Sequence, residues 1–167
     1  VVCTTVALQI FEETNAPSNT PAIAAAMSFL DKQFRFNNWP NIGENCNEAP
    51  HAPWWKYNEN WACTDRFLAN PGAEIISYQL HYGSKLPSLV QNNLLERALE
   101  HLNQHELEMH ELLNYVRLYH CKYLSSHYRE AMTPALLNHS YQLVKVNPAD
   151  WEEYGLTQID LVKIASP

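Results

Sequence analysis

The chain has 167 residues, of which 46% are hydrophobic and 11% aromatic, so it is long enough for one domain with a substantial core. Its formal net charge of −7 and the lack of any run of basic residues argue against nucleic acid and anionic membranes as partners. No apolar stretch reaches the length of about 18 residues that a membrane span needs. We therefore expect one globular domain over residues 1–167.

Apolar residues repeat at helical spacing in six segments, which predicts an all-α fold. Thr20-Pro21, Asn70-Pro71 and Pro87 indicate helix starts, Gly83 a helix end, and Thr133-Pro134 the start of the sixth helix. In chain order, the predicted apolar stripes are Val2, Val6 and Ile10; Ile23, Met27, Leu30 and Phe34; Ile76 and Leu80; Val90, Leu94, Ala98 and Leu102; Met109, Leu112, Leu113, Val116 and Tyr119; and Leu136, Leu137, Tyr141 and Val144. Shorter and longer helices alternate, so we expect three αα-hairpins side by side, with the first helices inside and the second helices outside.

A loop from about residue 37 to residue 69 holds four of the five tryptophans, Trp39, Trp54, Trp55 and Trp61. Its prolines are incompatible with a helix interior or a central strand. Indoles on a loop need something to pack against, and long aromatic loops are often binding elements. We expect this loop to form a lid or plug at one mouth of the helical array.

The C-terminal residues are predicted to be largely extended. Asn147-Pro148 is typical of a single capped turn, with Trp151 buried inside it. The residues from Thr157 to Ile164 alternate in polarity like a strand, although a lone strand has little to pair with. The sequence therefore predicts an extended C-terminal tail.

Four segments together resemble a group of uncharacterised bacterial proteins: APHAPWW (49–55), NPGAEII (70–76), EMHELL (108–113) and NPADWEEYGL (147–156). Those proteins are similar to the α/α-toroid superfamily, which includes protein prenyltransferase β-subunits and squalene–hopene-type terpene cyclases. The resemblance spans almost the whole chain and implies the C-terminal portion of a toroid. The cyclase Asp-x-Asp-Asp motif and the prenyltransferase Asp/Cys/His zinc set are both absent, so neither activity is carried over.

The resemblance implies five to seven hairpins in a closed ring, and three hairpins form only a partial toroid. The chain also starts without a methionine and enters apolar helical residues at once. We expect N-terminal repeats to be missing. An N-terminal segment or a second copy of the chain would then cover the open apolar edge.

The four cysteines, Cys3, Cys46, Cys63 and Cys121, lack Cys-x-x-Cys spacing, which argues against a zinc cluster. The sequence requires no cofactor. Free thiols in a cytoplasmic protein are the first interpretation of this pattern. A bridge between Cys46 and Cys63 across the tryptophan loop is the alternative.

His51, Trp54 and Trp55 form the first candidate binding site. Two adjacent indoles can make a stacking floor for a flat ligand, with His51 as a hydrogen-bond donor or a base. The alternative is that the loop closes one end of the helical array and its tryptophans complete the core.

Polar residues interrupt the apolar stripes of the predicted inner helices at Glu74, Tyr78, Glu108, His110, Glu111, Tyr115 and Arg117. Glu74–Tyr78 and Glu111–Tyr115 are neighbours at spacing i,i+4. A buried carboxylate needs compensation, which Arg117, a metal or a basic ligand could supply. The functional interpretation is a cavity with acid and base groups, and the structural one is a hydrogen-bond network or helix capping by Glu74 and Glu108.

His101 and His105 have the spacing of a two-histidine zinc site, but the glutamate of His-Glu-x-x-His is missing. We expect both to face solvent at the end of an outer helix. His120, His127 and His139 are predicted to be surface or capping residues.

Two functions remain open. The first is binding of a small or hydrophobic ligand, or of a protein partner, in the central hollow, with His51, Trp54, Trp55, Tyr78, Tyr115 and Arg117 as contact residues. The second is an enzyme that uses Glu74, His110, Glu111 and His51 as acid, base or metal-binding groups. The missing superfamily motifs favour the first.

Overall fold

Helices dominate the chain, which we describe from a computed structural model covering residues 1–58, 65–152 and 155–165. The side chains of residues 54 and 163–165 lie outside that description. The elements are α1 (Val2–Glu13), α2 (Pro21–Gln33), η1 (Glu44–Glu48), η2 (Pro53–Trp55), α4 (Ala69–Tyr82), α5 (Ser88–Gln104), α6 (Met109–His120), α7 (Ser126–Leu143), β1 (Val144–Lys145), η3 (Pro148–Asp150), β2 (Leu156–Thr157) and α8 (Gln158–Ala165). The all-α prediction is confirmed.

Proline and glycine set several helix boundaries as predicted. Pro21 is the first residue of α2, and α5 begins directly after Pro87. Asn70 has non-helical backbone angles, so the regular part of α4 starts at Pro71. α4 ends at Gly83, whose φ of 87° lies in the region that glycine adopts at low cost.

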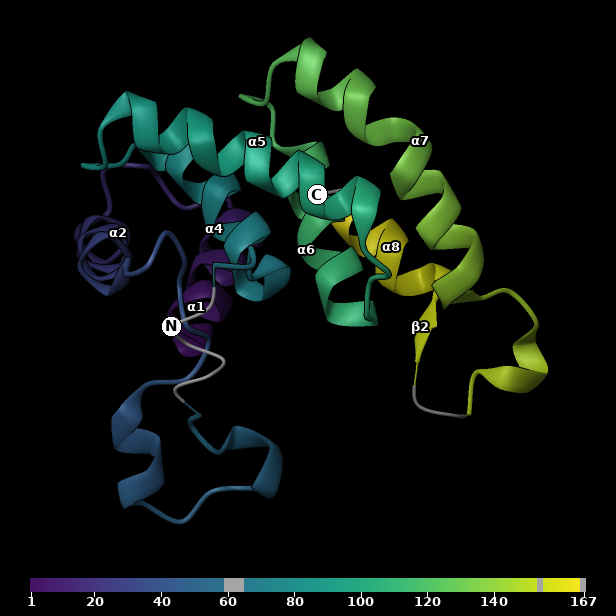
Figure 1. Cartoon of the computed structure of the whole chain (residues 1–167), viewed down its shortest axis with the longest axis horizontal. Coiled ribbons are helices and arrows are strands. Elements are labelled where there is room, and N and C mark those ends of the chain that lie inside the picture. Colours follow the sequence, from purple (N-terminus) through teal and green to yellow (C-terminus); the bar gives the residue numbers. More distant parts are fainter. Residues whose placement is uncertain (59–64, 153–154, 166–167) are drawn as a thin grey trace.

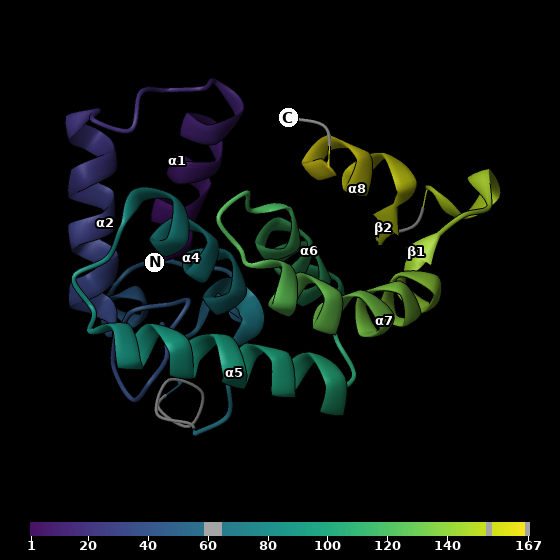
Figure 2. The same ribbon diagram turned by 90° about the horizontal axis from the view of Figure 1, so that it is seen from above.

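α4 and α6 occupy the centre of the structure (Figure 2). Nearly every residue of α4 from Ala69 to Gln79 is buried, and α4 packs extensively along α6. α1 and α2 lie on the far side of α4, and α7 and α8 lie on the far side of α6. α5 packs against both α4 and α7. The central pair therefore contacts most of the other helices, which explains why so little of the surface of α4 is exposed.

The prediction that a helix starts at Pro134 is wrong. α7 begins at Ser126 and carries Pro134 in its interior, on the exposed side. Proline removes the hydrogen bond to the carbonyl four residues earlier, that of Glu130. Glu130 is itself exposed, so water can satisfy that carbonyl.

The apolar stripe predicted for α7 is also wrong in part. Its buried face consists of Met132, Leu136 and His139, at intervals of four and three residues. Leu137 and Tyr141 are exposed. His139 was expected at the surface, but it is buried and its Nε2 lies 3.0 Å from the Leu102 carbonyl oxygen of α5. That contact explains how a polar ring occupies a core position.

α1 is rotated relative to the prediction. Its buried residues are Thr5 and Leu8, whereas Val6 and Ile10 of the predicted stripe are exposed, Ile10 by 54%. The Thr5 hydroxyl is satisfied within the helix, donating to the Val2 carbonyl at 2.9 Å. A polar residue that pairs with its own backbone can therefore face the core.

The same substitution at two isoleucines tests this rotation. Ile10→Val is expected to change the free energy of unfolding by less than about 0.5 kcal/mol, because the side chain is already exposed. Ile23→Val in α2, where the side chain is 1% exposed, is expected to cost about 1 kcal/mol. Urea unfolding measures the free energy of unfolding of both variants. Equal losses of this free energy would mean that the Ile10 face is buried in solution.

The C-terminal tail is not extended as predicted. Within the described part of the tail, Leu156–Thr157 forms a short strand that pairs in parallel with Val144–Lys145, and the following residues form α8, which packs on α6. Trp151 is exposed and not buried, with its indole N–H donating to the Lys145 carbonyl at 2.9 Å. The missing partner for a lone strand is thus supplied by β1, the two residues that follow α7.

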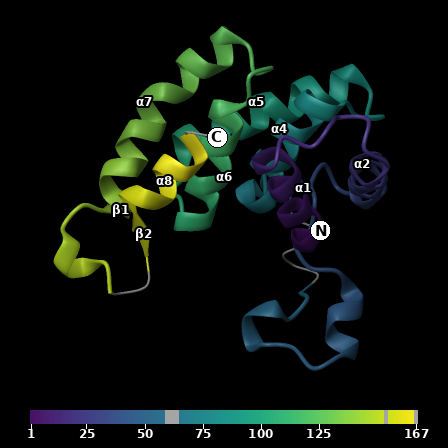
Figure 3. The same ribbon diagram turned by 180° about the vertical axis from the view of Figure 1, so that it is seen from behind.

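The tryptophan-rich loop is pinned at both ends and projects from the helices in between (Figures 1 and 3). Trp39 is fully buried and donates to the Leu30 carbonyl at 2.9 Å. The buried Asn38 side chain donates to the Arg66 carbonyl and accepts from the Leu68 amide, both at 2.9 Å. These hydrogen bonds hold the two ends of the loop together. The prediction that this loop forms a lid or plug stays a prediction.

Candidate functional site

Glu74 lies at the centre of a buried polar cluster between α1, α4 and α6. Its side chain is enclosed, with the residue only 2% exposed. The Tyr78 hydroxyl and the Gln9 side-chain amide both donate to its Oε1, at 2.5 Å and 2.6 Å. Arg117 Nε lies 3.5 Å from the same oxygen. Arg117 is thus the compensating cation that a buried carboxylate needs.

Burial controls the ionisation of this cluster. Desolvation raises the pKa of Glu74 above its ordinary value, and the hydrogen bond from Tyr78 and the charge of Arg117 oppose that rise. Burial and the neighbouring Glu74 carboxylate raise the pKa of Tyr78, so its hydroxyl stays protonated and keeps donating. The cluster therefore holds its carboxylate by several partners at once.

A hollow of about 440 Å³ opens beside Arg117, at the C-terminal ends of α1, α4 and α6. Its lining includes Phe11, Glu12, His81, Tyr82, Arg117 and His120. Helix C-termini carry partial negative charge, which Arg117 and Lys122 on the lining offset. His81 Nδ1 lies 3.1 Å from Glu12 Oε1, and the His81 ring stacks on Tyr82 at 4.2 Å. The walls are therefore fixed by contacts between side chains.

Arg117 presents unused hydrogen-bond donors to this hollow. Its side chain is 20% exposed and lines the wall, and its ion pair with Glu74 is made through Nε. Within the described residues, the Arg117 amino groups Nη1 and Nη2 make no hydrogen bond, and no fully buried side-chain nitrogen or oxygen lacks one. The two amino groups are therefore available as hydrogen-bond donors on a residue of the wall. A guanidinium fork in this state matches the two oxygens of a carboxylate.

Glu111 and Tyr115 belong to a second cluster, around His101 of α5. His101 Nδ1 lies 3.1 Å from the Tyr115 hydroxyl, which donates to the Ala98 carbonyl at 2.8 Å. Arg66 Nη2 lies 3.3 Å from His101 Nε2, and Glu111 lies 3.8 Å from it. Because Tyr115 donates onward and Arg66 can only donate, His101 carries its proton on Nδ1.

The prediction that His101 faces solvent is wrong, since the residue is 3% exposed. Burial first, then the nearby charges of Arg66, His105 and His139, lower the pKa of His101 to about 4. His101 is thus a neutral structural group that joins α5 to α6. Its spacing from Leu94 and Ala98 places it on the buried stripe of α5, a signal that the sequence did contain.

Glu108 has a structural role. Its side chain accepts from the Glu111 amide at 3.0 Å, and the Glu111 side chain accepts from the Glu108 amide at 3.1 Å. This capping box starts α6 and bears out the capping interpretation for Glu108. Glu74 caps no helix start. The two carboxylates Glu74 and Glu111 consequently sit in different clusters.

The described contacts of the two clusters do not include His110, His51 or Trp55. His110 is exposed on the first turn of α6. His51 is exposed on the projecting loop, where its Nδ1 lies 2.6 Å from the Ala49 carbonyl, and Trp55 is exposed beside it. The Trp54 side chain, Trp61 and Cys63 lie outside the described residues. The structure thus brings together Glu74, Tyr78 and Arg117, and sequence reasoning missed Gln9, Phe11, His81 and Tyr82.

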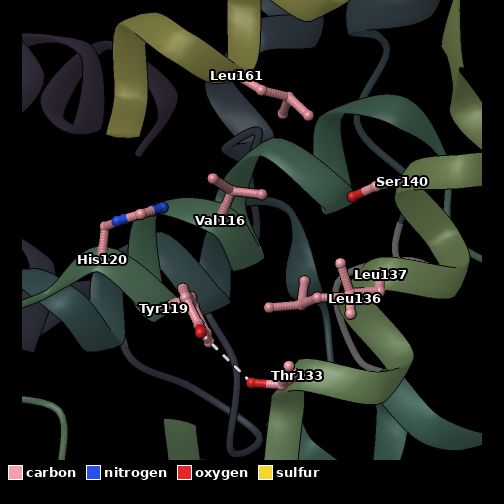
Figure 4. A pocket seen from close by; sticks show the side chains of 8 residues that line it. All are labelled: Val116, Tyr119, His120, Thr133, Leu136, Leu137, Ser140 and Leu161. Carbon is pink, nitrogen blue, oxygen red and sulfur yellow. Dashed lines mark hydrogen bonds between the residues drawn. The ribbon is translucent and has the colours of Figure 1, made fainter. Parts of the chain in front are cut away.

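A second hollow, of about 220 Å³, lies between α6, α7 and α8 (Figure 4). Its walls are mainly apolar and include Val116, Leu136, Leu137 and Leu161. The Thr133 hydroxyl on its edge is occupied, donating to the Arg129 carbonyl at 2.8 Å. His120 lines this hollow as well as the first one.

Neither a metal centre nor a membrane span is found in the described part of the chain. No three or more His, Cys, Asp or Glu side chains there are arranged to hold a metal ion. None of the described helices has the length and apolar character needed to cross a bilayer. The chain matches no known family model, no curated protein and no solved structure.

Proposed function

We propose that this protein binds a small organic anion in the hollow between α1, α4 and α6. The observation that supports this proposal is Arg117, which lines a hollow of about 440 Å³ and whose Nη1 and Nη2 make no hydrogen bond to the described residues. That volume lies in the usual range for small-molecule sites. Phe11 and Tyr82 add aromatic surface to the walls.

Binding is better supported than catalysis. An acid–base mechanism would need Glu74, His110, Glu111 and His51 around one substrate. Glu74 is held by Tyr78, Gln9 and Arg117, whereas Glu111 caps α6 and faces His101. These contacts favour structural roles for both carboxylates.

We also propose that the helix pairs α1/α2, α4/α5 and α6/α7 are repeats of a partial α/α toroid. In each pair the second helix is longer, with 12 and 13, 14 and 17, and 12 and 18 residues. The exposed Val6 and Ile10 of α1 would adjoin a further helix pair or a second copy of the chain in such an array. The free thiols of Cys3 and Cys121 agree with a cytoplasmic location, which we keep as part of this proposal.

Titration with sodium butanoate, followed by amide NMR shifts, tests the binding site. We expect saturable shifts at the C-terminal ends of α1, α4 and α6, and none with sodium chloride at equal ionic strength. The variant Arg117→Gln/Glu74→Gln removes both charges of the buried pair and is expected to abolish the shifts while far-UV circular dichroism stays unchanged.

Arg35→Gln is the matched control, because it removes an exposed arginine outside the hollow. It is expected to bind butanoate like the unmodified protein. Shifts scattered over the surface, or shifts that persist in the double variant, would refute the site.

A further inference from the structure

The two hollows share a lining residue at the end of α6. His120 lines both, while Arg117 faces the hollow on one side of the helix and Val116 faces the hollow on the other. His120 is exposed, and Figure 4 shows its ring extending along α6 toward Val116. Among the described residues that line the two hollows, His120 is the one they share.

The two hollows differ sharply in chemistry. The first contains ionic groups of both signs, among them Arg117, Glu12 and Lys122. The second contains leucine and valine side chains from three helices. Leu137, on its wall, is 54% exposed, so the apolar surface is open to a ligand.

We infer that the ligand is an anionic amphiphile, with a carboxylate head at Arg117 and a short apolar tail that crosses His120 into the hollow between α6, α7 and α8. This inference rests on the proposed function and adds the chemical class of the ligand. A tail in the second hollow removes leucine surface and methylene groups from water together, which is the source of its affinity.

The charges around the first hollow favour a carboxylate head over a phosphate. Glu12 and Glu13 both line the hollow that Arg117 faces. Their charges repel a dianion more strongly than a monoanion. A singly charged head therefore matches the site better than a doubly charged one.

A chain-length series tests the inference. Butanoate, hexanoate, octanoate and decanoate are titrated by calorimetry below their micelle concentrations. From hexanoate onward we expect affinity to rise about fourfold per methylene, until the second hollow is filled. Octylamine, with the opposite charge, is expected not to bind, and octyl phosphate to bind more weakly than octanoate.

Two leucine variants localise the tail. Leu137→Asp places a charge on the wall of the second hollow and is expected to abolish the gain from hexanoate to decanoate while butanoate still binds. Leu89→Asp is the matched control, because this α5 leucine is 81% exposed and lines neither hollow. It is expected to leave the whole series unchanged.

The outcomes separate the inference from the proposed function. If butanoate binds but affinity does not change with chain length, the tail site is refuted and the anion site stands. A chain-length gain that survives Leu137→Asp also refutes the tail site. If octyl phosphate binds as tightly as octanoate, the carboxylate assignment is overturned. Failure of every carboxylate, or equal binding of octylamine, refutes both proposals.

Discussion

Replacing Glu74 by alanine is expected to lower the free energy of unfolding by about 3 kcal/mol, because it breaks a buried ion pair from one side. Arg117 would keep its charge in a mostly buried position without the carboxylate at 3.5 Å. Tyr78 and Gln9 would lose the acceptor that they now share at 2.5 Å and 2.6 Å. The Tyr78 hydroxyl retains only a long bond of 3.4 Å to the Thr5 carbonyl.

Glu74→Gln is the control for this substitution. A glutamine keeps an oxygen for Tyr78 and Gln9, so we expect a loss of only about 1 kcal/mol at pH 7. Burial raises the folded-state pKa of Glu74 above 4.5, so ionisation weakens the native state as pH rises through that folded value. The stability gap between the natural protein and Glu74→Gln should therefore narrow between pH 4.5 and pH 7 in urea titrations. If Glu74→Ala and Glu74→Gln lowered the free energy of unfolding by the same amount, this account of the cluster would be contradicted.

Local backbone chemistry explains why several helix boundaries could be predicted from the sequence. Pro21 and Pro87 fix φ at or just before a first helical turn, and Gly83 supplies the positive φ that ends α4. These effects act within a few residues. Because these proline and glycine effects do not depend on distant parts of the chain, the sequence alone is enough to predict the helix boundaries that they set.

The errors arise where packing overrides the local signal. Pro134 usually marks a boundary, yet on the exposed side of α7 the helix continues through it. In α1, Val6 and Ile10 are more apolar than Thr5, yet Thr5 faces the core because its hydroxyl bonds to its own helix. Which face of a helix is buried depends on the neighbouring helices, and the local sequence of that helix does not reveal them.

The candidate site shows the same division. The Glu74–Tyr78 contact follows from i,i+4 spacing and could be predicted. Gln9 reaches Glu74 from 65 residues away, and the hollow forms only where three helix ends converge. Such long-range convergence has no counterpart in local spacing, which is why Phe11, His81 and Tyr82 were not predicted.

Acidification from pH 6.5 to pH 4 is expected to remove about 3 kcal/mol of stability through His101 alone. The pKa of His101 is lowered to about 4 in the folded protein, against an ordinary value of 6.5. Between these values the unfolded chain binds a proton that the folded chain does not, so stability falls as pH falls. Glu111, at 3.8 Å, gives little protection, because burial raises its own pKa and makes it neutral earlier in the acid range.

Because other carboxylates also titrate, the informative quantity is the difference in stability between the natural protein and His101→Gln. Glutamine cannot ionise, so this difference should shrink steadily from pH 6.5 to pH 4 in urea unfolding. His127→Gln is the matched control: His127 is an exposed histidine of α7 and is not among the groups whose charge lowers the pKa of His101. Its stability should parallel that of the natural protein across the same range. A constant difference for His101→Gln would mean that His101 is already charged in the fold, which Arg66 at 3.3 Å from its Nε2 would oppose.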